Sequence, residues 1–138
     1  MIISKKYHFY AGHRNENLKD KCSNLHGHTY YIIMDFDLDY NKDTGITMLF
    51  SDIDLIVEPI IKQLDHSLLI NKKDPLLKYL HLFMSEENTD LKLSVLNNLT
   101  SAENLAEHIF KLVEKNLPIK KLTLQETTTS SVIYENSN

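Results

Sequence analysis

The sequence predicts an α+β fold whose strands and helices follow the order ββααββ. Two long segments near the N-terminus alternate apolar and polar residues, two later segments repeat apolar residues at helical spacing, and two short alternating segments follow them. With 138 residues, 42% of them hydrophobic, the chain can bury well over half of its unfolded surface. We therefore expect a single domain over residues 1–138.

The first two strands should turn their histidines to one face. The first covers residues 2–13, and its apolar face ends in His13. The second covers residues 26–38, and its inward positions are His26, His28, Tyr30, Ile32, Met34, Phe36 and Leu38. Turn residues at 41–45 predict a hairpin in which residues 46–50 return as a partner strand, so the N-terminal half should be antiparallel.

Two main helices should follow. The first is capped by Ser51 or Asp52, and its interior Pro59 should kink or bulge the helix without breaking it. Asp65 and His66 lie at its C-terminal end. Its apolar stripe consists of Ile53, Ile56, Val57, Ile60, Ile61 and Leu64. The second helix begins at the capping-box pattern of residues 100–103, ends before Pro118, and turns inward Leu105, Ile109, Leu112 and Val113.

The last two strands cover residues 120–127 and 131–134, and they place Glu126 in one row with Leu122 and Leu124. Between the two main helices, Asp74–Pro75 can start a further helix, and the polar residues 85–90 favour a loop. The apolar stripe of this further helix would be Leu76, Leu77, Leu80 and Phe83. The sequence assigns no role to the insertion at residues 72–98.

Charge and composition exclude several classes of function. The 15 Lys and Arg residues against 19 Asp and Glu give a net charge of −4, so neither nucleic acid nor an anionic membrane is expected as a partner. The single cysteine cannot form an internal disulfide, and no apolar run approaches the roughly 20 residues that span a bilayer. No signal pattern opens the sequence. We expect a cytoplasmic protein that acts on a small molecule.

Three histidines are the main candidates for a metal site. His26 and His28, joined by His13 from the neighbouring strand, offer three nitrogen ligands and leave one position open, as a catalytic zinc ion requires. The alternative is that His26 and His28 are hydrogen-bonded residues of a half-buried strand. The third histidine favours the metal, because three imidazoles on one apolar face are costly to satisfy otherwise.

Other residues could transfer protons or bind a substrate. Cys22 lies in a loop with Lys19 and Lys21, which could lower the pKa of its thiol and make it a base or nucleophile; the alternative is an inert, buried thiol. In the Asp65–His66 pair, the carboxylate could orient a proton-exchanging imidazole, or the imidazole could simply complement the helix dipole. Glu126 could accept two N–H bonds from a heterocycle, or pair with a buried lysine or arginine.

Taken in order, these motifs resemble the 6-pyruvoyl-tetrahydropterin synthase and 6-carboxytetrahydropterin synthase family. They span nearly the whole chain and comprise Phe9–Arg14, Cys22-x-x-x-His26-Gly-His28, Thr44–Gly45, Leu64–His66, Ser101–Ala106, Glu126–Thr127 and Tyr134. The resemblance implies that the three histidines hold zinc and that Glu126 anchors the pterin ring. It further implies proton transfer by Cys22, Asp65 and His66, and a pterin contact at Ser101.

The resemblance also implies an architecture. In the tunnelling fold (T-fold) of this family, each subunit contributes a four-stranded antiparallel sheet with two helices, and trimers close their sheets into a barrel. Such closure would remove the exposed sheet edges. Active sites would be shared between the subunits of a homo-oligomer, a trimer or a dimer of trimers. The expected order of two strands, two helices and two strands agrees with this fold.

The activity implied is that of a zinc-dependent lyase acting on a pterin triphosphate. Three residues separate Cys22 from His26, as in bacterial 6-carboxytetrahydropterin synthases, whereas tetrahydrobiopterin-pathway enzymes commonly have five. This gap favours conversion of 7,8-dihydroneopterin triphosphate to 6-carboxy-5,6,7,8-tetrahydropterin, acetaldehyde and triphosphate, on the route to queuosine. The alternatives are 6-pyruvoyl-tetrahydropterin synthase, which leaves the side chain uncleaved, and a catalytically silent zinc-binding or pterin-binding scaffold.

Several positions depart from the family pattern. Leu49 replaces an acidic residue, Leu69–Ile70 replaces Leu-Asn after the Asp-His pair, and Thr100–Ser101 replaces Pro-Thr. Ser101 keeps the hydroxyl, whereas Ile70 leaves the local turn undefined. Arg14 could steer the triphosphate, and Lys19 and Lys21 could either assist it or remain solvated.

Overall fold

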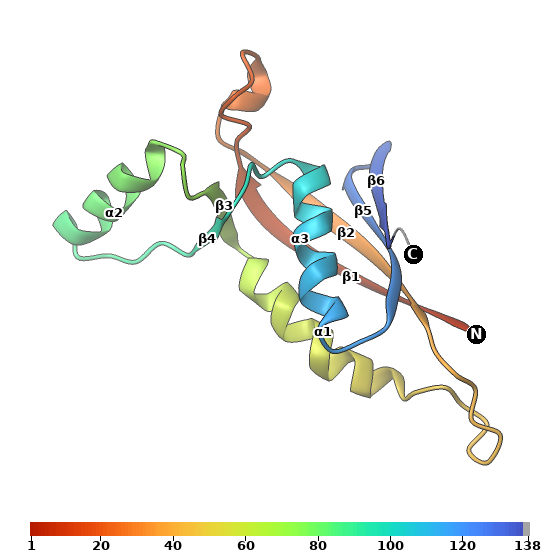
Figure 1. Ribbon diagram of the computed structural model, residues 1–138. Coiled ribbons are helices and arrows are strands. Elements are labelled where there is room, and N and C mark those ends of the chain that lie inside the picture. The colour runs from red at the N-terminus through yellow and green to blue at the C-terminus, as the bar shows by residue number, and fades with distance from the viewer. Residues whose placement is uncertain (137–138) are drawn as a thin grey trace.

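A computed structural model describes residues 1–136 and contains, within that range, one six-stranded mixed sheet and three α-helices (Figure 1). A single 3₁₀ turn, η1 (Lys21–Ser23), precedes the second strand. The strands and helices are β1 (Ile2–His13), β2 (His26–Asp37), α1 (Phe50–Leu64), β3 (Ser67–Asn71), α2 (Leu76–Glu86), β4 (Leu93–Leu96), α3 (Ala102–Glu114), β5 (Ile119–Thr127) and β6 (Ser130–Glu135).

The sheet has the strand order β4-β3-β1-β2-β5-β6. Strands β1, β2, β5 and β6 pair antiparallel, which confirms the predicted four-stranded antiparallel core. Strands β3 and β4 extend it with parallel pairing, and β3 contacts β1 only at Ala11 and Gly12. The sequence does not predict either strand, because five-residue and four-residue segments are too short to show a period. Ile70, expected in a turn, is a buried residue of β3.

Helices α1 and α3 contact each other and pack on the sheet, so that one hydrophobic core lies between sheet and helices (Figure 1). The predicted stripes are buried in large part: α1 buries Ile53, Val57, Ile61 and Leu64, and α3 buries Ala102, Leu105, Ala106, Ile109, Phe110 and Val113. Ile56, Ile60 and Leu112, also predicted to point inward, are only partly buried. Helix α1 continues past Pro59 without a break, as expected.

The helix starts differ in part from the prediction. Helix α1 begins at Phe50 after the N-cap residue Leu49, which makes no side-chain cap hydrogen bond, so neither Ser51 nor Asp52 caps it. At α3 the Ser101 hydroxyl accepts a hydrogen bond from the Asn104 backbone N–H at 3.3 Å. Residues 100–103 therefore do contain the cap, one position later than a box opened by Thr100.

The predicted hairpin strand at residues 46–50 is wrong. Asn41 and Ile46 form one isolated bridge, with Gly45 at a φ of 76°, and the chain then runs directly into α1. Strand β2 has no free edge for a third neighbour, because β1 occupies one side and β5 the other. The segment after the turn therefore leaves the sheet.

Helix α2 confirms the start expected at Asp74–Pro75 but not the burial that its apolar stripe implies. No residue of α2 is buried within the described part of the chain, and Figure 1 shows it standing apart from the layer of α1 and α3. Within residues 1–136, no helix combines the length and the apolar character that crossing a bilayer requires.

Candidate functional site

The three predicted histidines converge at one end of the sheet. The β1–β2 register sets His13 opposite His26 and Ala11 opposite His28, and one ligand nitrogen from each histidine lies within 4.8 Å of the other two. Gly27 permits the close strand approach here, since a Cβ at this position would lie 3.2 Å from the Ala11 carbonyl oxygen. The predicted cluster is thus present, and we call these three residues the histidine triad.

Backbone carbonyls fix the orientation of two imidazoles. His13 Nδ1 lies 2.9 Å from the Thr100 carbonyl oxygen, and His26 Nδ1 lies 2.8 Å from that of Asn24. A carbonyl can only accept, so each Nδ1 carries the proton and each Nε2 keeps its lone pair. This arrangement is the usual support of histidines that bind a metal.

The triad fits a metal ion. His13 is fully buried, and its Nε2 makes no well-aligned hydrogen bond within the described chain, although Glu126 Oε1 lies 3.3 Å away. A buried nitrogen without a well-aligned partner is costly unless something else binds it. Partial burial lowers the pKa of His28; the Glu126 carboxylate opposes this, and the neighbouring His13 and His26 lower the pKa further, so that the net shift favours the neutral, metal-binding form. Three nitrogens and an open position suit zinc.

Glu126 lies against the triad. Its Oε1 is 3.3 Å from His13 Nε2 and 3.2 Å from His28 Nε2, and the imidazole of His13, followed by that of His28, lowers the pKa of this carboxyl. A β-bulge between Gln125 and Thr127 leaves Glu126 outside the ladder with β6. The alternative partner considered for it, a buried lysine or arginine, is not present among residues 1–136.

Cys22 lies on η1, just before β2. The Asn15 N–H donates to the Cys22 carbonyl at 2.8 Å and so folds this loop back on the end of β1. Desolvation, followed by the Asp20 carboxylate, raises the pKa of the thiol; Lys21 lowers it, and Glu126 raises it further. Lys21 thus acts in the expected direction, but the expected net lowering of the thiol pKa is wrong for the groups of the chain, because desolvation and Asp20 outweigh Lys21.

Asp65 and His66 form the predicted pair, but at the edge of β1. Asp65 Oδ1 accepts from the Tyr10 N–H at 2.9 Å, and its Oδ2 lies 2.7 Å from His66 Nδ1. The Tyr10 hydrogen bond, then His66, lowers the pKa of Asp65. His66 has a φ of 57° and a side chain 74% exposed. No hydrogen bond or ion pair of the described residues links this pair to Cys22 or the triad.

Arg14 is held by an ion pair. Its Nε and Nη2 donate to the two carboxylate oxygens of Asp74 at 2.8 and 2.6 Å, so its guanidinium faces the insertion. Lys19 and Lys21 are exposed, which agrees with the solvated alternative. Ser101 lies next to Thr100 and, while capping α3, keeps its hydroxyl proton free to donate.

Three residues around the triad are not predicted as site residues by the sequence. The Thr100 and Asn24 carbonyls orient imidazoles, and the Thr100 hydroxyl donates to the Arg14 carbonyl at 3.2 Å. The Tyr30 ring lies 5.6 Å from the His28 ring, and its buried hydroxyl has no hydrogen-bond partner among residues 1–136. Only Tyr30 had a sequence signal, its even position on β2; carbonyl contacts depend on loop geometry that residue types do not encode.

Comparison with known proteins agrees with this geometry. A sequence model described as 6-pyruvoyl tetrahydropterin synthase matches residues 2–137. Proteins named 6-carboxy-5,6,7,8-tetrahydropterin synthase are 28% identical in Aquifex aeolicus (96% of each chain) and 30% identical in Rickettsia conorii (98% of this chain, 94% of the relative). A 6-pyruvoyl tetrahydrobiopterin synthase of Pongo abelii is 29% identical over 96% of this chain and 90% of its own.

Solved structures show the same fold. An uncharacterized Wolinella succinogenes protein superposes with a TM-score of 0.81 at 18% identity, covering 99% of this chain and 98% of the other. The Caenorhabditis elegans 6-pyruvoyl tetrahydropterin synthase gives 0.71 at 20% identity, covering 99% and 96%. Fold and site thus define an α+β protein of the T-fold class with a histidine metal site. The chain belongs to the 6-pyruvoyl tetrahydropterin synthase family.

The triad predicts zinc binding that depends on His28. After loading and desalting, the wild-type chain should retain one zinc ion per chain in elemental analysis, and His28→Ala should retain far less because one of three ligands is gone. Glu126→Gln should keep the ion. His8→Ala, on the opposite face of β1, is the matched control; equal zinc in His8→Ala and His28→Ala would contradict the assignment.

The Arg14–Asp74 pair predicts a pH-dependent contribution to stability. Hydrogen bonds from Arg14 lower the pKa of the buried Asp74, so the stabilisation is complete above the unfolded carboxyl pKa of about 3.9 and is lost as pH falls through the lower folded pKa. At pH 7, Asp74→Asn should lower the free energy of unfolding in urea by on the order of 3 kcal/mol. Below the folded pKa of Asp74, the free energies of unfolding of Asp74→Asn and the wild type should become equal. The exposed control Asp90→Asn should change little; equal stability of Asp74→Asn and wild type at pH 7 would refute this.

Proposed function

We propose that this chain is a zinc-dependent lyase that converts 7,8-dihydroneopterin triphosphate and water to 6-carboxy-5,6,7,8-tetrahydropterin, releasing acetaldehyde and triphosphate, in 7-deazaguanine biosynthesis. The observation that carries the proposal is the convergence of three imidazoles, two of them oriented by backbone carbonyls, beside the carboxylate of Glu126, in a chain of this family. Zinc bound there would supply Lewis acidity at the side-chain hydroxyls of the substrate.

The choice between the two products rests on the segment before the triad. Relatives bearing either name are similarly identical to the chain, at 28–30%, so identity alone does not separate the carboxy and pyruvoyl activities. The three-residue gap between Cys22 and His26 favours the first. This gap would set how far before the start of β2 the thiol lies from the metal ligands, and with it which substrate carbon the thiol would reach.

Other residues of the chain would transfer protons and bind the pterin ring. Cys22, as the thiolate, would take the carbon-bound proton of the substrate side chain, while Asp65 holds His66 by Nδ1 so that its Nε2 can give or receive protons. Glu126 would accept two N–H bonds from the pterin ring, since its carboxylate already faces the metal ligands. Ser101 could donate its hydroxyl proton to the same ring.

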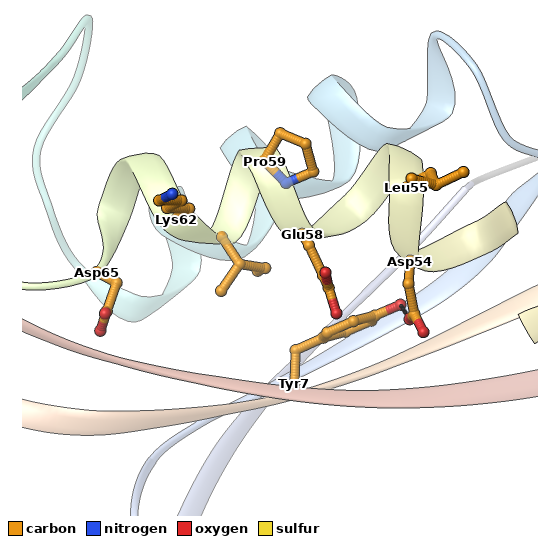
Figure 2. A pocket seen from close by; sticks show the side chains of 8 residues that line it. Tyr7, Asp54, Leu55, Glu58, Pro59, Lys62 and Asp65 are labelled. Carbon is orange, nitrogen blue, oxygen red and sulfur yellow. Dashed lines mark hydrogen bonds between the residues drawn. The ribbon is translucent and has the colours of Figure 1, made fainter. Parts of the chain in front are cut away.

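The exposed sheet edges support an oligomer with shared sites. Residues 2–9 of β1 have no strand partner on their outer side in the described chain, and neither does β6. Beside the β1 edge lies a cavity of about 600 Å³. Figure 2 shows Asp54 and Glu58 of α1 directed toward Tyr7 of β1, whose hydroxyl donates to Asp54 at 2.7 Å. The cavity is lined by Tyr7, Asp54, Leu55, Glu58, Pro59, Ile61, Lys62 and Asp65.

Strand direction determines what a neighbouring copy would bring. Strand β1 runs toward the triad and β6 runs away from it, so β6 of one copy can pair antiparallel with β1 of the next. The histidine triads of the two copies then lie at the same end of the combined sheet. Asp65 and His66, at the β1 edge beside Tyr10, would face the site of that neighbour, which explains why they lie apart from Cys22 within one chain.

Product analysis tests the proposed reaction. Zinc-loaded protein incubated with 7,8-dihydroneopterin triphosphate should yield acetaldehyde and a 6-carboxypterin in mass spectrometry. Glu126→Gln should raise KM more than it lowers kcat, because it removes a contact made before the chemical step. A diketo side chain without acetaldehyde would assign the pyruvoyl activity instead. Bound zinc without any turnover would indicate a silent scaffold.

Mixing of inactive variants tests the shared site. Cys22→Ala and His66→Ala should each fold, keep zinc and lose turnover. Dissociating and reassembling them together should restore part of the activity, because some interfaces then combine an intact Cys22 with an intact His66. Cys22→Ala mixed with the double variant Cys22→Ala/His66→Ala is the matched control and should stay inactive. Failure of the first mixture to exceed this control would place the whole proton-transfer set within one chain.

A further inference from the structure

Helix α2 carries an apolar face that the described chain does not cover. Tyr79, Leu82 and Phe83 follow the i, i+3, i+4 spacing of one helix face, and they are 58%, 51% and 46% exposed. An isolated helix of 11 residues is marginal in water, so a helix of this length normally depends on packing of its apolar face. Something outside one chain should therefore cover α2.

The charges on α2 indicate what covers it. Lys78, Leu82 and Glu86 are spaced by four residues, so they form one exposed row with a cation, an apolar residue and an anion in that order. Neither charge has an ion-pair partner in the described chain. The flanking residues have the same distribution of charge, basic before the helix and acidic after it: Lys72 and Lys73 precede α2, and Glu87 and Asp90 follow it.

This row is complementary to the same row on a second, antiparallel helix. If a two-fold axis passes between the Leu82 side chains of the two helices, Lys78 of each copy faces Glu86 of the other, because both residues lie four positions from Leu82. The basic start of one helix then also lies beside the acidic end of its partner, and the two helix dipoles oppose each other favourably. A two-fold contact requires this self-complementarity, because the same patch is used by both subunits.

We propose that α2 is a self-association surface on which α2 of a second copy packs antiparallel about a two-fold axis at Leu82. The insertion at residues 72–98 thereby acquires a role. This contact uses neither the β1 edge nor the β6 edge, so it joins two chains, or two closed rings of chains, without competing with edge pairing. It depends on neither the metal site nor the proposed reaction.

Sedimentation velocity on the full chain tests the apolar centre of the contact. Leu82→Asp should halve the assembled mass relative to wild type while leaving the circular dichroism spectrum unchanged. Tyr40→Asp, an equally exposed site in the turn after β2, is the matched control and should keep the wild-type mass. A wild-type mass retained by Leu82→Asp, or a wild-type chain that is monomeric at all concentrations, would overturn the proposal.

Charge reversal tests the antiparallel register without altering the apolar face. Lys78→Glu and Glu86→Lys should each halve the assembled mass, because every contact then pairs like charges. The double variant Lys78→Glu/Glu86→Lys should regain the wild-type mass, as should an equimolar mixture of the two single variants. Lys42→Glu controls for net charge. Loss of mass that neither the double variant nor the mixture restores would exclude the two-fold antiparallel arrangement.

Discussion

The register between β1 and β2 is the constraint on which the site depends. It aligns His13 with His26 and places His28 beside them on the helix-facing side. A slip of one residue would turn both histidines of β2 to the outer face together with the core residues Tyr30 and Ile32. The apolar core thus enforces the geometry of the triad, because any other register would expose buried side chains at a large cost in free energy.

A second layer of contacts ties the triad to the insertion. Asp74, at the start of the insertion, holds Arg14, and Thr100, just beyond its end, holds His13 through a carbonyl. The last residue of β1 and the residue that follows it are therefore held by residues near the two ends of one segment. A displacement of β3, α2 and β4 would strain the orientation of His13, so we expect the insertion to be rigid near the sheet even though α2 projects from it.

Sequence patterns located the main residues of the site but not the contacts that support them. Strand parity found His13, His26, His28 and Glu126, because a period of two residues is set by backbone geometry. Strand parity did not find the short strands β3 and β4, since β3 forms by pairing with β1 and β4 by pairing with β3. The Arg14–Asp74 pair joins positions 60 residues apart, and the effect of Asp20 on Cys22 depends on how one loop folds. Such contacts are decided by tertiary structure, which residue spacing does not specify.

The molecule presents two kinds of unsatisfied surface, and they differ in symmetry. The β1 and β6 edges are different surfaces, so their pairing is head-to-tail and must close into a ring or continue as a fibre. The α2 row is complementary to itself, so its pairing ends at two copies. On the proposals made above, the first contact builds each active site and the second doubles the assembly. The two surfaces share no residue. Substitutions that abolish the α2 contact between copies should therefore leave the ring of chains, and with it the active site, intact.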